Sequence, residues 1–138
     1  MMRTLALDVG TKTIGVAVSD ELGITANGVT TIQRKSLKDD LDELKSIIDE
    51  YRPQEIVVGV PYLEDGSVNE RGDQILKFSE KIKSAFSIPV LYWDESYSTV
   101  NAEKKLLEAD MSRKKRKKVI DKMAAVFILQ EYLESKRY

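Results

Sequence analysis

Apolar residues follow two different periods along this chain, and the order of the two periods restricts how it can fold. Short segments rich in β-branched and small residues come first, and they predict strands over residues 4–9, 14–19 and 24–33. Tight turns between consecutive strands favour antiparallel pairing. These three strands are therefore expected to form an antiparallel meander.

Helix-like and strand-like segments alternate in the rest of the chain. Ser36 followed by Asp39 is typical of a helix start, and Pro53 ends the apolar spacing that follows. The later segments are a strand over 55–60, a helix around 75–82, a strand over 89–93, a helix over 99–109, a basic connection and a last helix from about 118 to 135. Strands reached through helical crossovers pair in parallel. We predict one α/β domain over residues 1–138, a mixed five-stranded sheet with helices on its faces, which is the ribonuclease H-like topology.

The composition restricts the chemistry that this chain can perform. It has 138 residues with no repeat and no linker-like stretch, as expected for one domain. It has no cysteine and no histidine, which excludes disulfides, thiolate catalysis, cysteine-ligated zinc and the commonest general base. No apolar stretch is long enough to span a bilayer and no signal region begins the chain, so we expect a cytoplasmic protein without a membrane partner.

Charged residues are segregated along the chain, although the formal net charge is only −1. Residues 104–122 hold nine Lys or Arg against three acids. At their centre is an uninterrupted run of cations: Arg113, Lys114, Lys115, Arg116, Lys117 and Lys118. Neutralising phosphates releases condensed counterions, so this segment favours binding to a nucleic-acid backbone. The alternative is a solvated connection, which is what most charge runs are.

Two acids are predicted at the ends of buried strands. Asp8 lies near the end of the first strand, and strand alternation places it on the same face as Ala6. Glu95 follows the fifth predicted strand in the equivalent position, and its neighbour Asp94 should face the other side. Ligands of open sheets gather beyond the carboxyl ends of parallel strands, so Asp8 and Glu95 are expected to meet there. The alternative for each acid is a hydrogen bond within a polar turn.

Asp121 is the third candidate, one turn into the most apolar predicted helix. Its neighbours three and four residues on are both alanine, so this helix face can approach the sheet closely and Asp121 is expected to point toward it. The alternative is an acid that complements the helix dipole. Oxygen ligands without histidine or cysteine suit Mg²⁺ or Mn²⁺, and hydrolysis assisted by two such ions needs no protein general base.

Several motifs, taken together, resemble one known family over nearly the whole chain. They are Leu7 to Ala17, Gly59-Val60-Pro61, Asp65-Gly66, Arg71, Trp93-Asp94-Glu95 and Lys115 to Ala125. On these residues the chain resembles the YqgF/RuvX family of pre-16S ribosomal RNA nucleases, also called Holliday junction resolvase-like proteins. The resemblance implies the ribonuclease H-like fold, catalysis and metal binding by Asp8, Glu95 and Asp121, and nucleic-acid contacts from Lys12, Arg71 and residues 113–118.

The same resemblance implies a substrate and a setting. The substrate would be structured nucleic acid, at the 5′ end of pre-16S ribosomal RNA in ribosome biogenesis, with the small ribosomal subunit as a further partner. Ser96 stands where the family often has arginine, which removes one expected phosphate contact. No fourth acid lies near Asp121, since Glu131 and Glu134 are too far along the helix, so we expect modest metal affinity. The sequence leaves the oligomeric state open.

Other activities stay open at this point. An actin-type ATPase or sugar kinase also carries an Asp-x-Gly-Thr loop, as Asp8 to Thr11 does here, but such enzymes need two domains and this chain has one such loop. A non-catalytic RNA-binding ribosome-assembly factor would bind through the same basic run. Within the nuclease class, a four-way DNA junction is the alternative substrate to RNA, because charge alone does not separate them.

Overall fold

A five-stranded mixed sheet forms the centre of the protein, as the computed structural model shows for residues 3–95 and 113–136, with side chains of the last helix described from residue 122. The elements are β1 (Thr4–Val9), β2 (Thr13–Ser19), β3 (Ala26–Gln33), α1 (Leu37–Tyr51), β4 (Glu55–Val60), α2 (Glu70–Phe86), β5 (Val90–Asp94) and α4 (Arg113–Lys136). The strand order is β3-β2-β1-β4-β5. The pairs β1–β2 and β2–β3 are antiparallel, whereas β1–β4 and β4–β5 are parallel, which confirms the predicted α/β sheet. The predicted helix over 99–109 lies outside the described residues.

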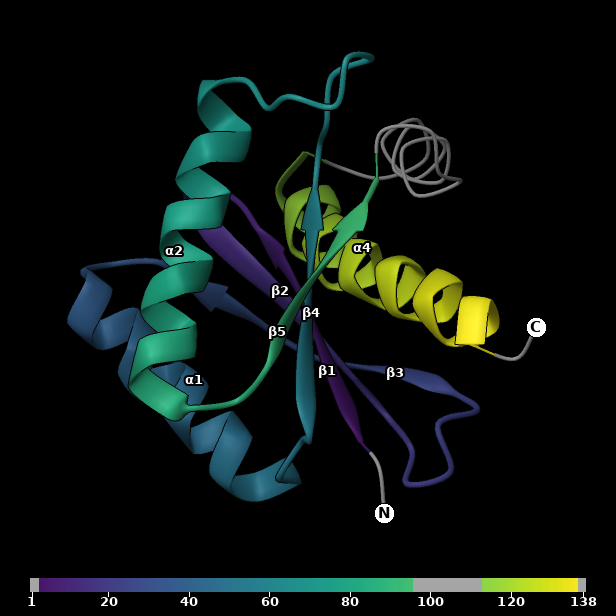
Figure 1. Cartoon of the computed structure of the whole chain (residues 1–138). Coiled ribbons are helices and arrows are strands. Elements are labelled where there is room, and N and C mark those ends of the chain that lie inside the picture. The colour runs from purple at the N-terminus through teal and green to yellow at the C-terminus, as the bar shows by residue number, and fades with distance from the viewer. Residues whose placement is uncertain (1–2, 96–112, 137–138) are drawn as a thin grey trace.

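Helices cover both faces of this sheet, with α1 and α2 on one side and α4 on the other (Figure 1). Strand alternation divides β1 between the two layers. Leu5 and Leu7 belong to the core cluster that includes the buried residues of α1 and α2. Ala6 packs with Ala124 and Ile128 of α4. Asp8 alternates with Leu7 and therefore lies on the α4 face, as predicted from the sequence.

Local interactions explain where the first helix and the first turn lie. Ser36 caps α1, since its hydroxyl oxygen accepts from the backbone N–H of Asp39 at 3.1 Å, and this confirms the predicted helix start. The helix stops at Arg52, which has a left-handed backbone (φ 49°) before Pro53. Gly10 closes the β1–β2 turn by donating its N–H to the carbonyl of Thr13 at 2.7 Å.

Several predicted boundaries differ from the observed ones by a residue or more, and two of these differences have a clear physical cause. The third strand begins at Ala26 rather than residue 24, because Asp20 accepts the N–H groups of Ile24 and Thr25 and holds them in the turn. The last helix begins at Arg113 rather than near residue 118, so the backbone of the basic run is helical and not a connection. Lysine and arginine are good helix formers and no glycine or proline interrupts them. None of the described helices is long and apolar enough to cross a membrane.

The C-terminal end of α4 is tied to the start of β4 through one carboxylate. Glu55 accepts from the hydroxyl of Tyr132 at 2.6 Å, from the ammonium of Lys136 at 3.1 Å and from the hydroxyl of Thr4 at 3.0 Å. Burial raises the pKa of Glu55, but these hydrogen bonds outweigh burial and the net pKa is lowered. The charged form of Glu55 therefore helps to hold α4 on the sheet.

Replacing Tyr132 by phenylalanine is expected to lower the free energy of unfolding by about 1 kcal/mol at neutral pH, because Glu55 loses one hydrogen bond to its charged form. The folded pKa of Glu55 lies below its ordinary value, so this stabilisation is present above the ordinary pKa and is lost as pH falls through the folded pKa. Denaturant titrations of both proteins at neutral and acidic pH measure this difference. A loss of equal size at both pH values would contradict the assignment.

Candidate active site

Asp8 lies at the carboxyl end of β1 with only 9% of its surface exposed. Its partner across the antiparallel β1–β2 pair is Gly15. On the other side, the parallel register pairs Leu7 with Val58, so Gly59 is the next residue of β4 beside Asp8. Both neighbouring positions lack a side chain on the α4 face. Glycine at both positions therefore lets other side chains approach this carboxylate closely.

Glu95 directly follows β5 and is 8% exposed. Its backbone N–H donates to the carbonyl of Val60 at 3.2 Å, which continues the β4–β5 ladder by one step. Its side chain lies over Gly59, because a Cβ built on this glycine would come within 2.9 Å of Glu95 Oε2. Asp8 therefore lies beside Gly59 and Glu95 lies over it, on the same face of the sheet. The sequence pattern predicted both acids at the carboxyl ends of their strands.

Asp94 lies on the opposite face. It is exposed, and its charge raises the pKa of Tyr62, whose burial raises that pKa further and is the larger cause. Tyr62 packs against the cluster on the α1 and α2 side of the sheet. The sequence-based expectation that Asp94 and Glu95 point to different sides is confirmed. Asp94 is thus a matched control for its neighbour.

Arg71 reaches the end of β1 from the first turn of α2. Its guanidinium donates to the carbonyl of Val9, one residue beyond Asp8. Burial and then the nearby charge of Arg34 lower the pKa of Arg71, whereas Asp8 and Glu95 raise it. The cation therefore lies within electrostatic range of both carboxylates. Its predicted contact with nucleic acid stays a prediction.

The donor set fits a hard divalent cation. Asp8 and Glu95 present carboxylate oxygens, the ligand type that Mg²⁺ and Mn²⁺ prefer, on one nearly buried face of the sheet. The described side chains contain no cluster of three or more acidic, histidine or cysteine groups that could hold a metal. Asp121 lies in α4 one turn before Ala124 and Ala125, which pack on the sheet. Its side chain, like those of residues 113–118, is outside the described part, so its predicted role is untested.

Sequence reasoning missed Arg34. Its Nε donates to Asp40 Oδ2 at 3.1 Å, its Nη1 donates to the carbonyl of Gly10 at 2.7 Å, and its guanidinium lies 4.6 Å from the ring centre of Phe78. Asp40 is 2% exposed, and a buried carboxylate requires a partner. A signal was present in the sequence, since Asp40 shares helical spacing with Leu44 and therefore lies on the buried face of α1.

Lys12, which was also predicted to contact nucleic acid, lies in the turn between β1 and β2, and its side chain is exposed. Its backbone carbonyl accepts the N–H of Arg34 at 2.8 Å. The structure thus brings Lys12, Arg34 and Arg71 to the same end of the sheet as Asp8.

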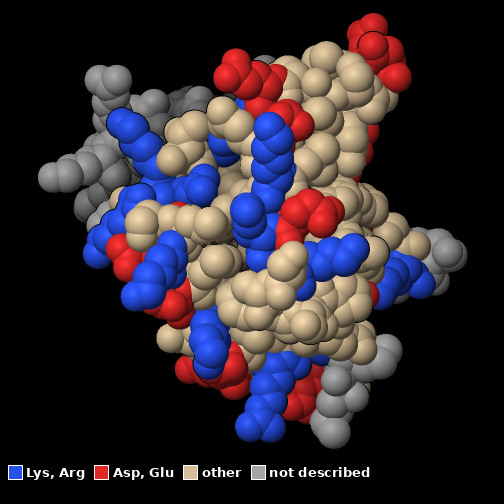
Figure 2. All heavy atoms as spheres, turned by 60° about the vertical axis from the view of Figure 1, so that its left-hand side comes forward, with Lys and Arg blue, Asp and Glu red and all other residues tan. Residues whose placement is uncertain are grey.

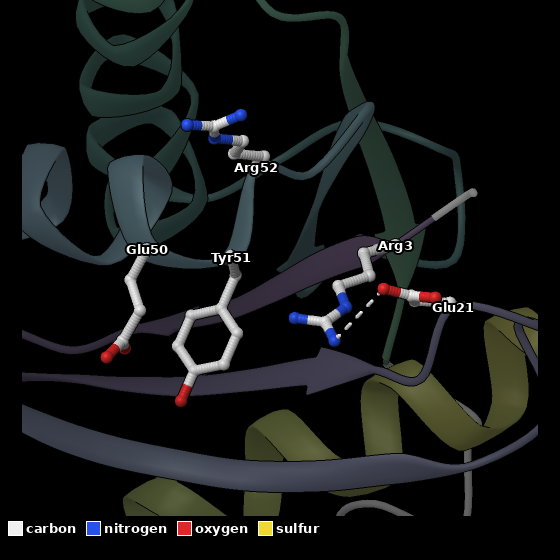
Figure 3. A pocket seen from close by; sticks show the side chains of 5 residues that line it. All are labelled: Arg3, Glu21, Glu50, Tyr51 and Arg52. Carbon is white, nitrogen blue, oxygen red and sulfur yellow. Dashed lines mark ion pairs between the residues drawn. The ribbon is translucent and has the colours of Figure 1, made fainter.

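A hollow of about 580 Å³ lies at the opposite end of β1 and does not belong to this group (Figure 3). Arg3 reaches toward Glu21 across 3.7 Å and lies 5.6 Å from the ring centre of Tyr51. The other lining residues, Glu50 and Arg52, also carry opposite charges. Because cations and anions balance there, this hollow selects neither a metal ion nor an anion.

The chain is similar over almost its whole length to known proteins. Residues 2–135 match the family described as "RuvX: Holliday junction resolvase". A protein of Clostridium novyi (strain NT), named "Putative pre-16S rRNA nuclease", is 54% identical over 134 residues, which are 97% of this chain and 99% of that protein. A protein of Geobacillus kaustophilus (strain HTA426) with the same name is 55% identical over 138 residues, which are 99% of this chain and 100% of that protein.

Solved structures share its fold at low sequence identity. Thermus thermophilus RuvC in complex with a Holliday junction substrate superposes with a TM-score of 0.60 at 13% identity, covering 99% of this chain and 96% of that chain. The fowlpox virus resolvase in complex with Holliday junction DNA superposes with a TM-score of 0.56 at 12% identity, covering 99% of this chain and 100% of that chain. These likenesses establish the fold alone, and the predicted ribonuclease H-like fold is confirmed.

Proposed function

Because this chain belongs to the RuvX family, we propose that it is a nuclease that hydrolyses phosphodiester bonds of structured nucleic acid with the help of Mg²⁺ or Mn²⁺. The observation that carries this proposal is the pair Asp8 and Glu95, two nearly buried carboxylates at Gly59. Two carboxylates on the same face of the sheet repel each other, and a divalent cation held by both would offset that repulsion.

Each residue has a distinct task in this proposal. Asp8, Glu95 and Asp121 hold the cations, which when bound supply Lewis-acid chemistry to the scissile phosphate. Arg71 places a fixed positive charge beside the two carboxylates, where it binds a phosphate oxygen of the substrate. Lys12 and the cations of residues 113–118 add backbone contacts that are independent of sequence.

The substrate that we propose is the 5′ end of immature 16S ribosomal RNA, in the cytoplasm and in association with the small ribosomal subunit. The names of the 54% and 55% identical relatives support this choice. A four-way DNA junction is the second candidate, since the description of the family names it. Both are folded nucleic acids whose closely spaced phosphates require the positive charges around Asp8.

Purified protein should cut one of these two substrates only when Mg²⁺ or Mn²⁺ is present, and chelation with EDTA should stop cutting while binding persists. End-labelled RNA carrying the precursor 5′ end and an end-labelled four-way junction, each incubated with either ion, measure both the preference and the position of the cut. Cutting of equal rate in EDTA would contradict the metal assignment. Salt-sensitive binding of both substrates with no cutting under any ion condition would instead identify a non-catalytic assembly factor.

A further inference from the structure

A second hollow, of about 380 Å³, lies on the α1 and α2 side of the sheet, at the end where β1 finishes. Its lining residues come from the β1–β2 turn, the β3–α1 connection and the first turns of both helices: Thr11, Arg34, Lys35, Leu37, Asp40, Arg71 and Gln74. We propose that it binds one backbone phosphate of the nucleic acid, next to the scissile phosphate, with Arg34 and Arg71 as its ligands. This inference rests on the proposed nuclease function.

Both guanidinium groups are anchored at the end of β1. Arg71 donates to the carbonyl of Val9, and Arg34 donates to the carbonyl of Gly10 at 2.7 Å. These are the two residues that directly follow Asp8: Val9 ends β1, and Gly10 begins the turn to β2. A nucleic-acid strand whose scissile phosphate lies at Asp8 therefore passes the end of β1, where both guanidinium groups are held.

The hollow carries an excess of positive charge. Arg34, Lys35 and Arg71 oppose a single carboxylate, Asp40, which is already engaged with Arg34 Nε and with the backbone N–H of Lys35. Two neighbouring guanidinium groups repel each other, and this repulsion is one cause of the lowered pKa of Arg71, after burial. An anion between the two groups would offset that repulsion.

The side chains that line the hollow suit a phosphate better than an uncharged polar ligand. Planar guanidinium groups bind phosphate oxygens through paired N–H donors, and Arg34 makes its hydrogen bonds to the protein through Nε and Nη1. The first turns of α1 and α2 add the positive ends of two helix dipoles. Elsewhere on this face Lys and Arg are interspersed with Asp and Glu (Figure 2), so the local group and not a broad field would attract the anion.

A phosphate walk tests this site without requiring cutting. Single phosphates of the preferred substrate are replaced by neutral methylphosphonates, and Kd is measured without added metal for the wild-type protein and for Arg34→Gln. We expect one replacement beside the cut to weaken binding by the wild-type protein about 10-fold. The same replacement should not weaken binding by Arg34→Gln, because that variant has already lost the contact with this phosphate. Arg34→Gln should weaken binding of the unmodified substrate about 10-fold as well.

Arg34 also binds the buried Asp40, so Arg34→Gln can affect folding, and a second variant is needed that leaves Asp40 bound. The Lys35 side chain lines the hollow and is exposed, and only its backbone N–H is bound to Asp40. Lys35→Gln should therefore fold normally and reduce the salt dependence of binding by about one ion. Lys38→Gln, on the same surface but outside the hollow, is the matched control and should have little effect.

Three outcomes separate this site from the proposed function. The phosphate site would be overturned if every replaced phosphate weakened binding equally in the wild type and in Arg34→Gln. It would also be overturned if Lys35→Gln and Lys38→Gln changed the salt dependence of binding equally. Metal-dependent cutting in that same experiment would leave the nuclease assignment intact. Coupling of Arg34 to one phosphate in a protein that never cuts would support the site and reject catalysis, whereas failure to bind either nucleic acid overturns both.

Discussion

Replacing Asp8 by asparagine is expected to lower kcat for phosphodiester cleavage by about 10³-fold, because the loss of a cation ligand removes several kcal/mol of transition-state stabilisation. Asparagine has nearly the same shape as aspartate and fits the space between Gly15 and Gly59. The variant should therefore fold and bind substrate like the wild type. Single-turnover cleavage at saturating Mg²⁺ or Mn²⁺ measures the loss, and Kd without metal shows that binding is retained.

The neighbouring acids supply the controls for this result. Glu95→Gln should lose activity to a similar extent, since its carboxylate lies on the same face as Asp8. Asp94→Asn changes the same charge one residue away on the opposite face and should keep near-wild-type cleavage. Asp121→Asn tests the third predicted ligand. Unchanged cutting by Asp8→Asn and Asp121→Asn would defeat the assignment of the site.

The meeting of Asp8 and Glu95 could be predicted because strand alternation is a strict rule. Asp8 is the next-to-last residue of one apolar strand and Glu95 directly follows another, and the period of two decides which face each acid occupies once the strand is recognised. The parallel order of β1, β4 and β5 then brings both acids to the same edge. These inferences need only local pattern and connectivity. Neither depends on the packing of side chains that are distant in sequence.

The hollow beside Arg34 could not be predicted in the same way. Arg34 and Asp40 lie in a polar stretch of mixed charges, where an arginine is usually a solvated side chain. Their pairing depends on the burial of Asp40 beneath the β3–α1 connection, which is a tertiary property. The start of α4 was misplaced for a related reason. Charge suggested an exposed connection, but helix propensity decided the backbone conformation.

Gly59 connects the stability of the fold to the geometry of the site, and Gly59→Ala is expected to impair both. A Cβ at this position would lie 2.5 Å from Ile128 Cδ1 and 2.9 Å from Glu95 Oε2, closer than side chains tolerate. Overpacking of this kind lowers the free energy of unfolding by about 1–3 kcal/mol. Displacing Glu95 by a fraction of an ångström should also lower kcat by about 10²-fold. Denaturant titration and single-turnover cleavage measure the two effects separately.

Two further variants separate the effect of Gly59→Ala on packing from its effect on catalysis. One is Gly28→Ala, and the other adds Ile128→Val to Gly59→Ala. Gly28→Ala places a Cβ 2.5 Å from a side-chain atom of Lys122, but that side chain is long and exposed and can move, so stability should change by less than about 0.5 kcal/mol. Ile128→Val removes Cδ1, the atom closest to the new Cβ, and should restore much of the stability of Gly59→Ala. Cleavage should stay low in that double variant, because the contact with Glu95 remains. Recovery of both properties together would mean that α4 packing alone, and not the position of Glu95, limits activity.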